Sequence, residues 1–140
     1  MSMADRTEAY AMSEAEISRS VTSEELVVFA VTGPVLTARI RAARFGADAG
    51  PKIAKRLPVE MGRLEPTPRF VVLDFSDTEF ISSAGLGACL TMFQHVQERG
   101  GTMAVYGLRK DIRTLFEITG IDGVLNVVNT PEELAAIVTD

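Results

Sequence analysis

The stretch Asp77-Thr78-Glu79-Phe80-Ile81-Ser82-Ser83-Ala84-Gly85-Leu86-Gly87 joins two segments with different hydrophobic patterns. The run before it, residues 70–75, is almost entirely apolar and predicts a buried strand. The residues after it predict an amphipathic helix over 83–98, because apolar side chains recur at helical spacing. Two serine hydroxyls therefore lie where a strand passes into a helix, next to backbone N–H groups that lack intrahelical partners. The predicted inward side of this helix consists of Leu86, Cys89, Leu90, Phe93 and Val96.

The two serines have a structural and a functional interpretation. Serine is a favoured N-cap worth roughly 1 kcal/mol, so we expect at least one of Ser82 and Ser83 to cap the helix. Capping does not account for Gly85 and Gly87, because glycine costs up to about 1 kcal/mol relative to alanine inside a helix. Small residues leave the first turn bare, which would allow another protein to approach a serine hydroxyl.

Length and charge narrow the class of protein. The 140 residues fit one domain, and a hydrophobic content of 46% is typical of a globular chain. A net charge of −5 argues against nonspecific nucleic-acid binding, which depends on cations, and so favours a protein partner. The sequence has no apolar run of about 20 residues and no signal-peptide pattern. We therefore expect a cytoplasmic protein without membrane insertion.

The N-terminal part predicts a tail followed by a hairpin. Residues 1–13 have no hydrophobic period and are expected to be a mobile tail, so that the domain spans 14–140. Alternation over 17–21, a polar turn at 23–25 and an apolar run over 26–31 predict an antiparallel strand pair. Residues 38–50, which carry Arg39, Arg41 and Arg44, are expected to be a loop insertion. This loop is either a solvated surface or a basic lip that meets an acidic partner or a phosphate group.

The rest of the chain alternates helices and strands. A helix is expected from Gly50-Pro51 to before Pro66, with Pro58 kinking it or dividing it into two short helices. Further elements are a strand over 102–106, a helix over 109–119 ended by Gly120, a strand over 124–128 and a final helix after a capping box at Thr130. This order predicts an α/β fold with a mostly parallel central sheet, an N-terminal antiparallel hairpin and about four helices.

Three segments resemble one known family, the STAS domain as found in anti-sigma factor antagonists. The run Phe80-Ile81-Ser82-Ser83-Ala84-Gly85-Leu86-Gly87 resembles the family's phosphorylation motif. Residues 111–121 resemble its third helix with the closing glycine, and residues 126–134 resemble its last strand and the start of its last helix. The close match covers about half of the chain, residues 70–140. Residues 32–36 resemble the family's glycine-containing exit from the second strand, although Thr37 stands where an acidic residue is common.

The resemblance implies a regulatory role. In such antagonists the serine that matches Ser83 accepts phosphate from a partner kinase, which is also the anti-sigma factor; the unmodified antagonist binds this partner and frees a sigma factor. Ser83 is preferred because its offset to Gly85 and Leu86 matches the family motif. Ser82, which stands where several family members have aspartate, is the second choice. The expected partner-binding residues are Thr78, Glu79, Phe80, Ile81, Ser82, Ser83, Ala84, Gly85 and Leu86. An alternative is a STAS subunit of a membrane transport complex or larger signalling assembly, without phosphorylation.

Little in the sequence predicts catalysis. His95 is the only histidine and is expected on the exposed side of its helix, and no G-x-S-x-G pattern surrounds either serine. A small serine hydrolase using Ser83 is therefore the weakest of the three functional hypotheses. Asp74 and Asp77 follow a buried strand, where loop and capping roles are expected rather than a metal site. We expect no cofactor and no metal ion, and Cys89 is expected in the core.

Overall fold

A five-stranded sheet forms the centre of the computed structural model, which describes residues 26–138. Its strand order is β1-β2-β4-β6-β7; β1 and β2 are antiparallel, and the other neighbouring strands are parallel. The strands of this sheet are β1 (Val27–Thr32), β2 (Val35–Ile40), β4 (Phe70–Asp74), β6 (Thr102–Tyr106) and β7 (Asn126–Val128). The helices are α3 (Ala49–Gly62), α4 (Ser83–Glu98), α5 (Lys110–Thr119), the short 3-10 helix η1 (Ile121–Gly123) and α6 (Pro131–Val138). The predicted α/β order is confirmed.

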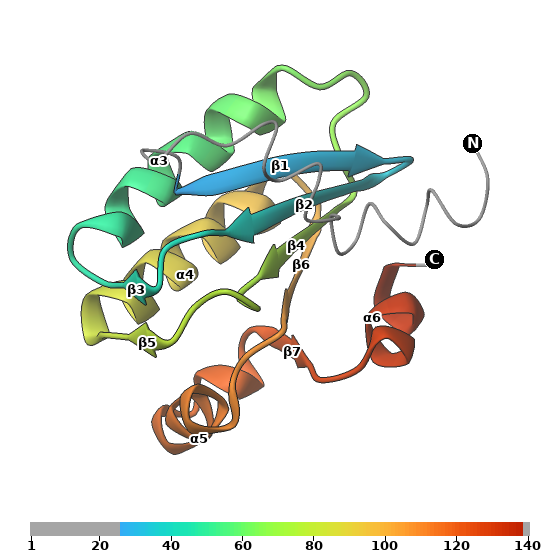
Figure 1. The fold of residues 1–140 in the computed structure, drawn as a ribbon. Coiled ribbons are helices and arrows are strands. Elements are labelled where there is room, and N and C mark those ends of the chain that lie inside the picture. The colour runs from blue at the N-terminus through green and yellow to red at the C-terminus, as the bar shows by residue number, and fades with distance from the viewer. Residues whose placement is uncertain (1–25, 139–140) are drawn as a thin grey trace.

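Helices cover the two faces of the sheet unequally. Side chains of α3, α4 and α5 pack with one face of the sheet in the larger hydrophobic cluster, in which Ile53, Cys89 and Phe116 are each buried. The helix α6 packs on the opposite face, where Leu134 and Val138 meet Val72 in a smaller cluster. In Figure 1, α6 lies apart from the pair formed by α3 and α4. The sheet is thus the middle layer of three, as expected for parallel strands that are buried on both faces.

The antiparallel hairpin occurs, but its strands are β1 and β2. Val27 pairs with Ile40 and Thr32 pairs with Val35, so the turn lies at Gly33-Pro34. Gly33 has a φ of +56°, a backbone conformation that glycine adopts at no steric cost. Residues 32–36 therefore form the glycine-containing turn that leads out of β1 and the start of β2. The strand expected over 17–21 and the tail expected over 1–13 lie outside the described residues.

The expected loop insertion at residues 38–50 is a loop only over 41–43 and 46–48, and the rest of it belongs to regular elements. Ala38 and Ile40 are buried in β2, Phe45 is fully buried in the two-residue strand β3 (Arg44–Phe45), and α3 begins at Ala49. The strand β2 was not predicted because its arginine, Arg39, and the nearby Arg41 made the segment resemble a polar loop. The guanidinium of Arg39 is satisfied within the fold, because it forms an ion pair with Asp77 at 3.2 Å, and such pairing lets a charged side chain occupy a strand.

The two helices beside the site follow the predicted pattern with three differences. α3 continues as one helix through Pro58, so the division into two short helices was wrong. α4 has the predicted bounds, and its buried face contains Leu86, Cys89 and Val96 as expected. Leu90, however, is 37% exposed, and Met92 is buried in its place. The buried face of α4 therefore contains Met92 where the spacing of apolar residues predicted Leu90.

The C-terminal part agrees with the prediction. Gly120 ends α5 with a φ of +76°, the left-handed conformation expected of a terminating glycine. The capping box at α6 is formed: the Glu133 N–H donates to Thr130 Oγ1 at 3.1 Å, and the Asn129 N–H donates to Glu133 Oε1 at 3.0 Å. Within the described part of the chain, none of the helices combines the length and the apolar character that crossing a membrane requires.

Candidate functional site

A short second sheet positions the loop that leads into α4. Its two strands, β3 and β5 (Phe80–Ile81), are parallel, and Arg44 pairs with Phe80 while Phe45 pairs with Ile81. The Ser82 N–H then donates to the Phe45 carbonyl oxygen at 3.2 Å. Residues 44–45 and 80–82, which are far apart in the sequence, are therefore joined by backbone hydrogen bonds at the entrance to α4 (Figure 1). The sequence analysis missed this ladder, because two-residue strands have no detectable period.

Threonine fastens the start of the same loop. The Thr78 side chain is fully buried, and its Oγ1 donates to the Ala42 carbonyl oxygen at 2.9 Å. The Glu79 N–H donates to the Ala43 carbonyl oxygen at 2.8 Å. Because buried polar groups in folded proteins are normally hydrogen-bonded, we interpret this threonine as a residue that holds the loop in place. The loop from 78 to 82 is thus held against residues 42–45 by both side-chain and backbone contacts.

The two serines have different environments. Ser82 is the N-cap of α4: its backbone is extended, with φ −95° and ψ 174°, and its Oγ accepts from the Gly85 N–H at 3.3 Å. Ser83 is the first residue of the helix and is exposed. Among residues 26–138, no hydrogen bond from the Ser83 hydroxyl is found. The capping role expected of one serine is therefore confirmed for Ser82, and the hydroxyl of Ser83 faces solvent.

Gly85 allows the helix to lie against the loop. A Cβ added at Gly85 would clash with the Phe45 carbonyl oxygen, which is a backbone atom that cannot move aside alone. Gly85 is buried, whereas Gly87 is exposed and a Cβ added there would have nothing within 4 Å. Internal packing therefore explains why residue 85 is glycine, but it does not explain why residue 87 is glycine.

An exposed aromatic side chain lies beside the serine. Phe80 is 49% exposed, and the Arg44 guanidinium carbon lies 5.5 Å from the centre of its ring, within the range of a cation–π contact. Arg44 is itself exposed. The outer surface of the β3–β5 ladder thus combines an apolar ring with a positive charge, three residues before Ser83.

The predicted partner-binding residues divide into two groups. Thr78, Ile81, Gly85 and Leu86 are buried, so their side chains offer little surface to a partner. The exposed members are Glu79, Phe80, Ser83 and Ala84, with Ser82 half-buried. Arg44 adjoins the exposed group, whereas the sequence analysis placed it in a separate segment, residues 38–50, as one arginine of the alternative basic lip. Its pairing with Phe80 across the ladder could not be read from residues 36 positions apart in the chain.

The two aspartates after β4 are engaged within the fold. Asp77 accepts from the Arg39 guanidinium in two hydrogen bonds of 3.2 Å, and its carboxylate lies 3.5 Å from Arg41 Nε. Asp74 is fully buried, and its Oδ1 accepts from the backbone N–H of Ser76 at 2.9 Å and from the Ser76 hydroxyl. Burial raises the pKa of Asp74 above its ordinary value despite these hydrogen bonds. Across residues 26–138, no group of three or more His, Cys, Asp or Glu side chains could hold a metal ion.

The arrangement does not support serine hydrolase chemistry at Ser83. His95 is the only histidine of the chain and lies twelve residues further along the same helix. At a rise of 1.5 Å per residue the two positions are about 18 Å apart, too far for a hydrogen bond between nucleophile and base. His95 is half-buried rather than exposed as expected. Cys89 lies in the core as expected, and burial raises the pKa of its thiol to about 12.

Sequence comparisons relate the chain to known regulators. BtrV of Bordetella bronchiseptica, named as a candidate anti-sigma factor antagonist, is 32% identical over 84 residues, which cover 59% of this chain and 72% of BtrV. The anti-sigma-B factor antagonist of Listeria monocytogenes is 27% identical over 62 residues. That match covers 44% of this chain and 54% of the Listeria protein, so it spans about half of that relative's length.

Structural comparisons agree on the fold. The anti-sigma factor antagonist SpoIIAA in its unphosphorylated form matches with a TM-score of 0.64 at 16% identity, over 79% of this chain and 92% of SpoIIAA. A sulfate transporter family protein from Wolinella succinogenes matches with a TM-score of 0.61 at 19% identity, over 83% of this chain and 90% of that protein. The family model described as the STAS domain matches residues 16–134. By this match the chain belongs to the STAS domain family.

Proposed function

We propose that this chain is an anti-sigma factor antagonist, and that phosphorylation of Ser83 ends its binding to an anti-sigma factor that is also a serine kinase. The unmodified chain would hold the anti-sigma factor and leave a sigma factor free. The names of the related proteins support the antagonist role, which is regulatory rather than catalytic. We expect this exchange in the cytoplasm and, because the chain carries a net charge of −5, without direct contact between the chain and DNA.

The observation that supports the switch most strongly is the difference between the two serines. Ser82 uses its hydroxyl inside the fold, as the N-cap that accepts from Gly85. Ser83 presents its hydroxyl to solvent at the start of α4, where the neighbouring exposed residues Ala84 and Gly87 are small. A kinase can therefore reach Ser83 without disrupting the cap. For this reason we assign the phosphate to Ser83 rather than to Ser82.

The position at a helix N-terminus makes the modification compatible with the fold. A phosphate adds about −1.5 to −2 charges, and the positive end of the α4 dipole stabilises negative charge there. Across a packed interface the same group is bulky and must lose its hydration. A penalty of roughly 3 to 4 kcal/mol would weaken binding by two to three orders of magnitude. The switch therefore needs no change of fold.

We infer that the partner contacts the exposed part of the loop as well as the serine. Phe80 and Arg44 form a partly exposed aromatic–cation pair, and phenylalanine and arginine are both enriched at protein interfaces. Glu79 lies next to them and is exposed. The buried residues Thr78 and Ile81 hold this loop in place, so we assign them a positioning role rather than direct contact.

Mass spectrometry of the protein from its native cells tests the switch directly. Intact mass with and without phosphatase, followed by peptide mapping, should find one phosphate on Ser83. Phosphate on Ser82 would keep the mechanism and correct the residue. A serine that stays unmodified under both growth and stress, in a chain that co-purifies with an integral membrane protein, would favour the second candidate, a STAS subunit of a transport complex. The fold shared with the Wolinella protein is the observation behind that candidate.

Substituting aspartate at Ser83 and, as a control, at Ser82 tests which serine controls binding to the kinase. We expect Ser83→Ala to keep affinity for the kinase and to abolish phosphorylation, and Ser83→Asp to weaken binding at least about tenfold, since the charge enters the interface. Ser82→Asp is the control, because aspartate caps a helix as well as serine does and its carboxylate would face Gly85. Calorimetric titration with the purified kinase measures all three. Equal affinity of the two aspartate variants would contradict the assignment of the switch to Ser83.

A further inference from the structure

We propose that the partner's docking surface continues beyond the serine along the outer face of α4 and into the groove between α4 and α3. This surface, here called the α4 face, is formed by Ser83, Ala84, Gly87, Leu90 and Thr91, all of which are exposed. Ser83 and Leu90 are seven residues apart on one helix, so the surface extends about 10 Å past the serine. The inference rests on the proposed function for the identity of the partner, but its evidence is independent of phosphorylation.

The first observation is the absence of charge on the α4 face. From Ser83 to Gln97 the chain contains no Asp, Glu, Lys or Arg residue. The exposed residues of the other two long helices differ: α3 presents Lys52, Lys55 and Arg56, and α5 presents Lys110, Asp111 and Glu117. A helix face that remains in water normally carries charged side chains. The α4 face lacks charged side chains, as does the core of an interface, from which charged residues are depleted.

The second observation is an exposed glycine inside the helix. Gly87 is the fifth residue of α4, and a Cβ added there would have nothing within 4 Å. Glycine weakens a helix interior relative to alanine, and no contact with residues 26–138 requires it at this position. A glycine of this kind permits close approach of another backbone. If the partner's main chain lies against Gly87, this contact explains why the residue is glycine.

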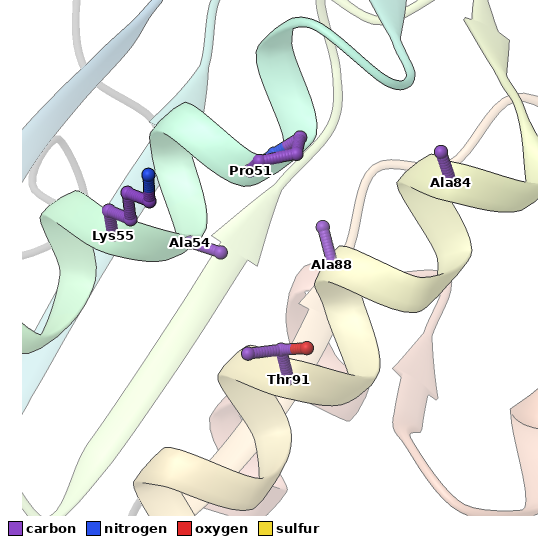
Figure 2. Close-up of a pocket in the computed structure, with 6 residues that line it drawn as sticks. All are labelled: Pro51, Ala54, Lys55, Ala84, Ala88 and Thr91. Atoms are coloured by element: carbon purple, nitrogen blue, oxygen red, sulfur yellow. The ribbon is translucent and has the colours of Figure 1, made fainter.

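The third observation is the groove that adjoins this face. Pro51, Ala54 and Lys55 from α3 and Ala84, Ala88 and Thr91 from α4 line a groove of about 280 Å³ (Figure 2). In Figure 2, Ala54 and Ala88 project into the space between the two helices, while the Lys55 side chain lies along its α3 side. The helices approach closely enough that a Cβ added at Gly50 would lie 3.1 Å from the Ala88 Cβ. The groove is therefore lined mostly by apolar side chains, and Lys55 is its one charged lining residue.

These features define the chemistry of the partner segment. A small apolar side chain fits the alanine-lined floor, and a carboxylate nearby can pair with Lys55. No ion pair of Lys55 is found within residues 26–138, whereas the neighbouring Lys52 is paired with Asp48 at 3.1 Å. We therefore assign the groove to a segment of the anti-sigma factor with an apolar residue next to an acidic one. Continuity of the groove with Ser83 through Ala84 places both contacts in one interface.

Site-specific photo-crosslinking in native cells tests the surface. The photoreactive residue p-benzoylphenylalanine replaces Gly87 in the full chain, and in the control it replaces Gly62. Gly62 is also an exposed helical glycine whose added Cβ would meet nothing within 4 Å, but it lies at the far end of α3. We expect a single adduct from position 87, with a protein that also co-purifies with a sigma factor, and none from position 62. An adduct with a second copy of this chain, equal labelling from both positions, or no adduct would overturn the proposal.

Affinity measurements with that crosslinked protein provide a second readout. Gly87→Leu should weaken binding at least tenfold, while Gly62→Leu should bind as the wild type does. Lys55→Glu should weaken binding more than Lys52→Glu, because only Lys55 faces the groove. Circular dichroism of each variant confirms that the fold is retained. If Ser83 is never phosphorylated and Gly87→Leu still loses affinity, the switch fails while the docking surface stands. If Gly87→Leu binds normally, the docking surface fails whatever the state of Ser83.

Discussion

The start of α4 has one serine and one glycine that contact the rest of the fold, and a second serine and glycine that are exposed to solvent. Inward, the Ser82 hydroxyl caps the helix and Gly85 lets it lie against the Phe45 carbonyl oxygen. Outward, Ser83 and Gly87 are exposed and make no comparable contact within the described part of the chain. One serine and one glycine therefore stabilise the fold, and the other pair remains accessible. The motif thus contains residues that stabilise the fold and residues that remain exposed, and the two sets alternate along the chain.

The largest effect is expected at the inward glycine. Gly85→Ala places a methyl group against the Phe45 carbonyl oxygen, so α4 or the β3–β5 ladder must move. Overpacking of this kind costs typically 1–3 kcal/mol, and we expect a loss of about 2 kcal/mol or more in the free energy of unfolding. Urea denaturation followed by far-UV circular dichroism measures it. Unchanged stability would mean that the close approach of the helix to residue 45 is not a constraint.

A smaller loss is expected at the inward serine. Ser82→Ala removes the N-cap acceptor of the Gly85 N–H and should lower the free energy of unfolding by about 1 kcal/mol. Ser83→Ala is the matched control, and its stability should remain within about 0.5 kcal/mol of the wild type, as for an ordinary surface substitution. The same denaturation experiment compares the two variants. A larger loss for Ser83→Ala than for Ser82→Ala would reverse the assignment of the cap.

The smallest effect is expected at the outward glycine, and it has the opposite sign. Gly87→Ala adds a methyl group in open space and gives α4 a better helix former, so stability should rise by up to about 1 kcal/mol. Together with Gly85→Ala, this variant compares one substitution at two positions of the same turn. Thermal unfolding of both proteins gives the comparison. If Gly87→Ala destabilised the fold, Gly87 would have a structural role and would no longer indicate an interface.

Local patterns were sufficient for the C-terminal two thirds of the fold. The apolar run of β4, the spacing of residues along α4 and the turn chemistry at Gly120 and Thr130 each act within a few residues of the chain. The predictions were wrong where contacts with a distant segment decide the structure of a residue. Arg39 makes β2 look like a polar loop until its partner Asp77 is known. Leu90 appears to be a core residue until α3 and α4 are placed together, when Met92 occupies the buried position instead.

The sequence by itself determined the α/β class, the elements α3, β4, α4, β6, α5, β7 and α6, the resemblance to the family and the pair of serines at the start of α4. Strand and helix periods, turn residues and a contiguous motif are local properties, so each can be recognised within a few residues. Only the tertiary structure decided which serine and which glycine face outward. That choice depends on residues 44–45, which form the β3–β5 ladder with residues 80–81, more than thirty positions away, and bring the Phe45 carbonyl oxygen against Gly85. Hydrogen bonds and close contacts between distant segments leave no period in the sequence, and so they become visible only when the chain is folded.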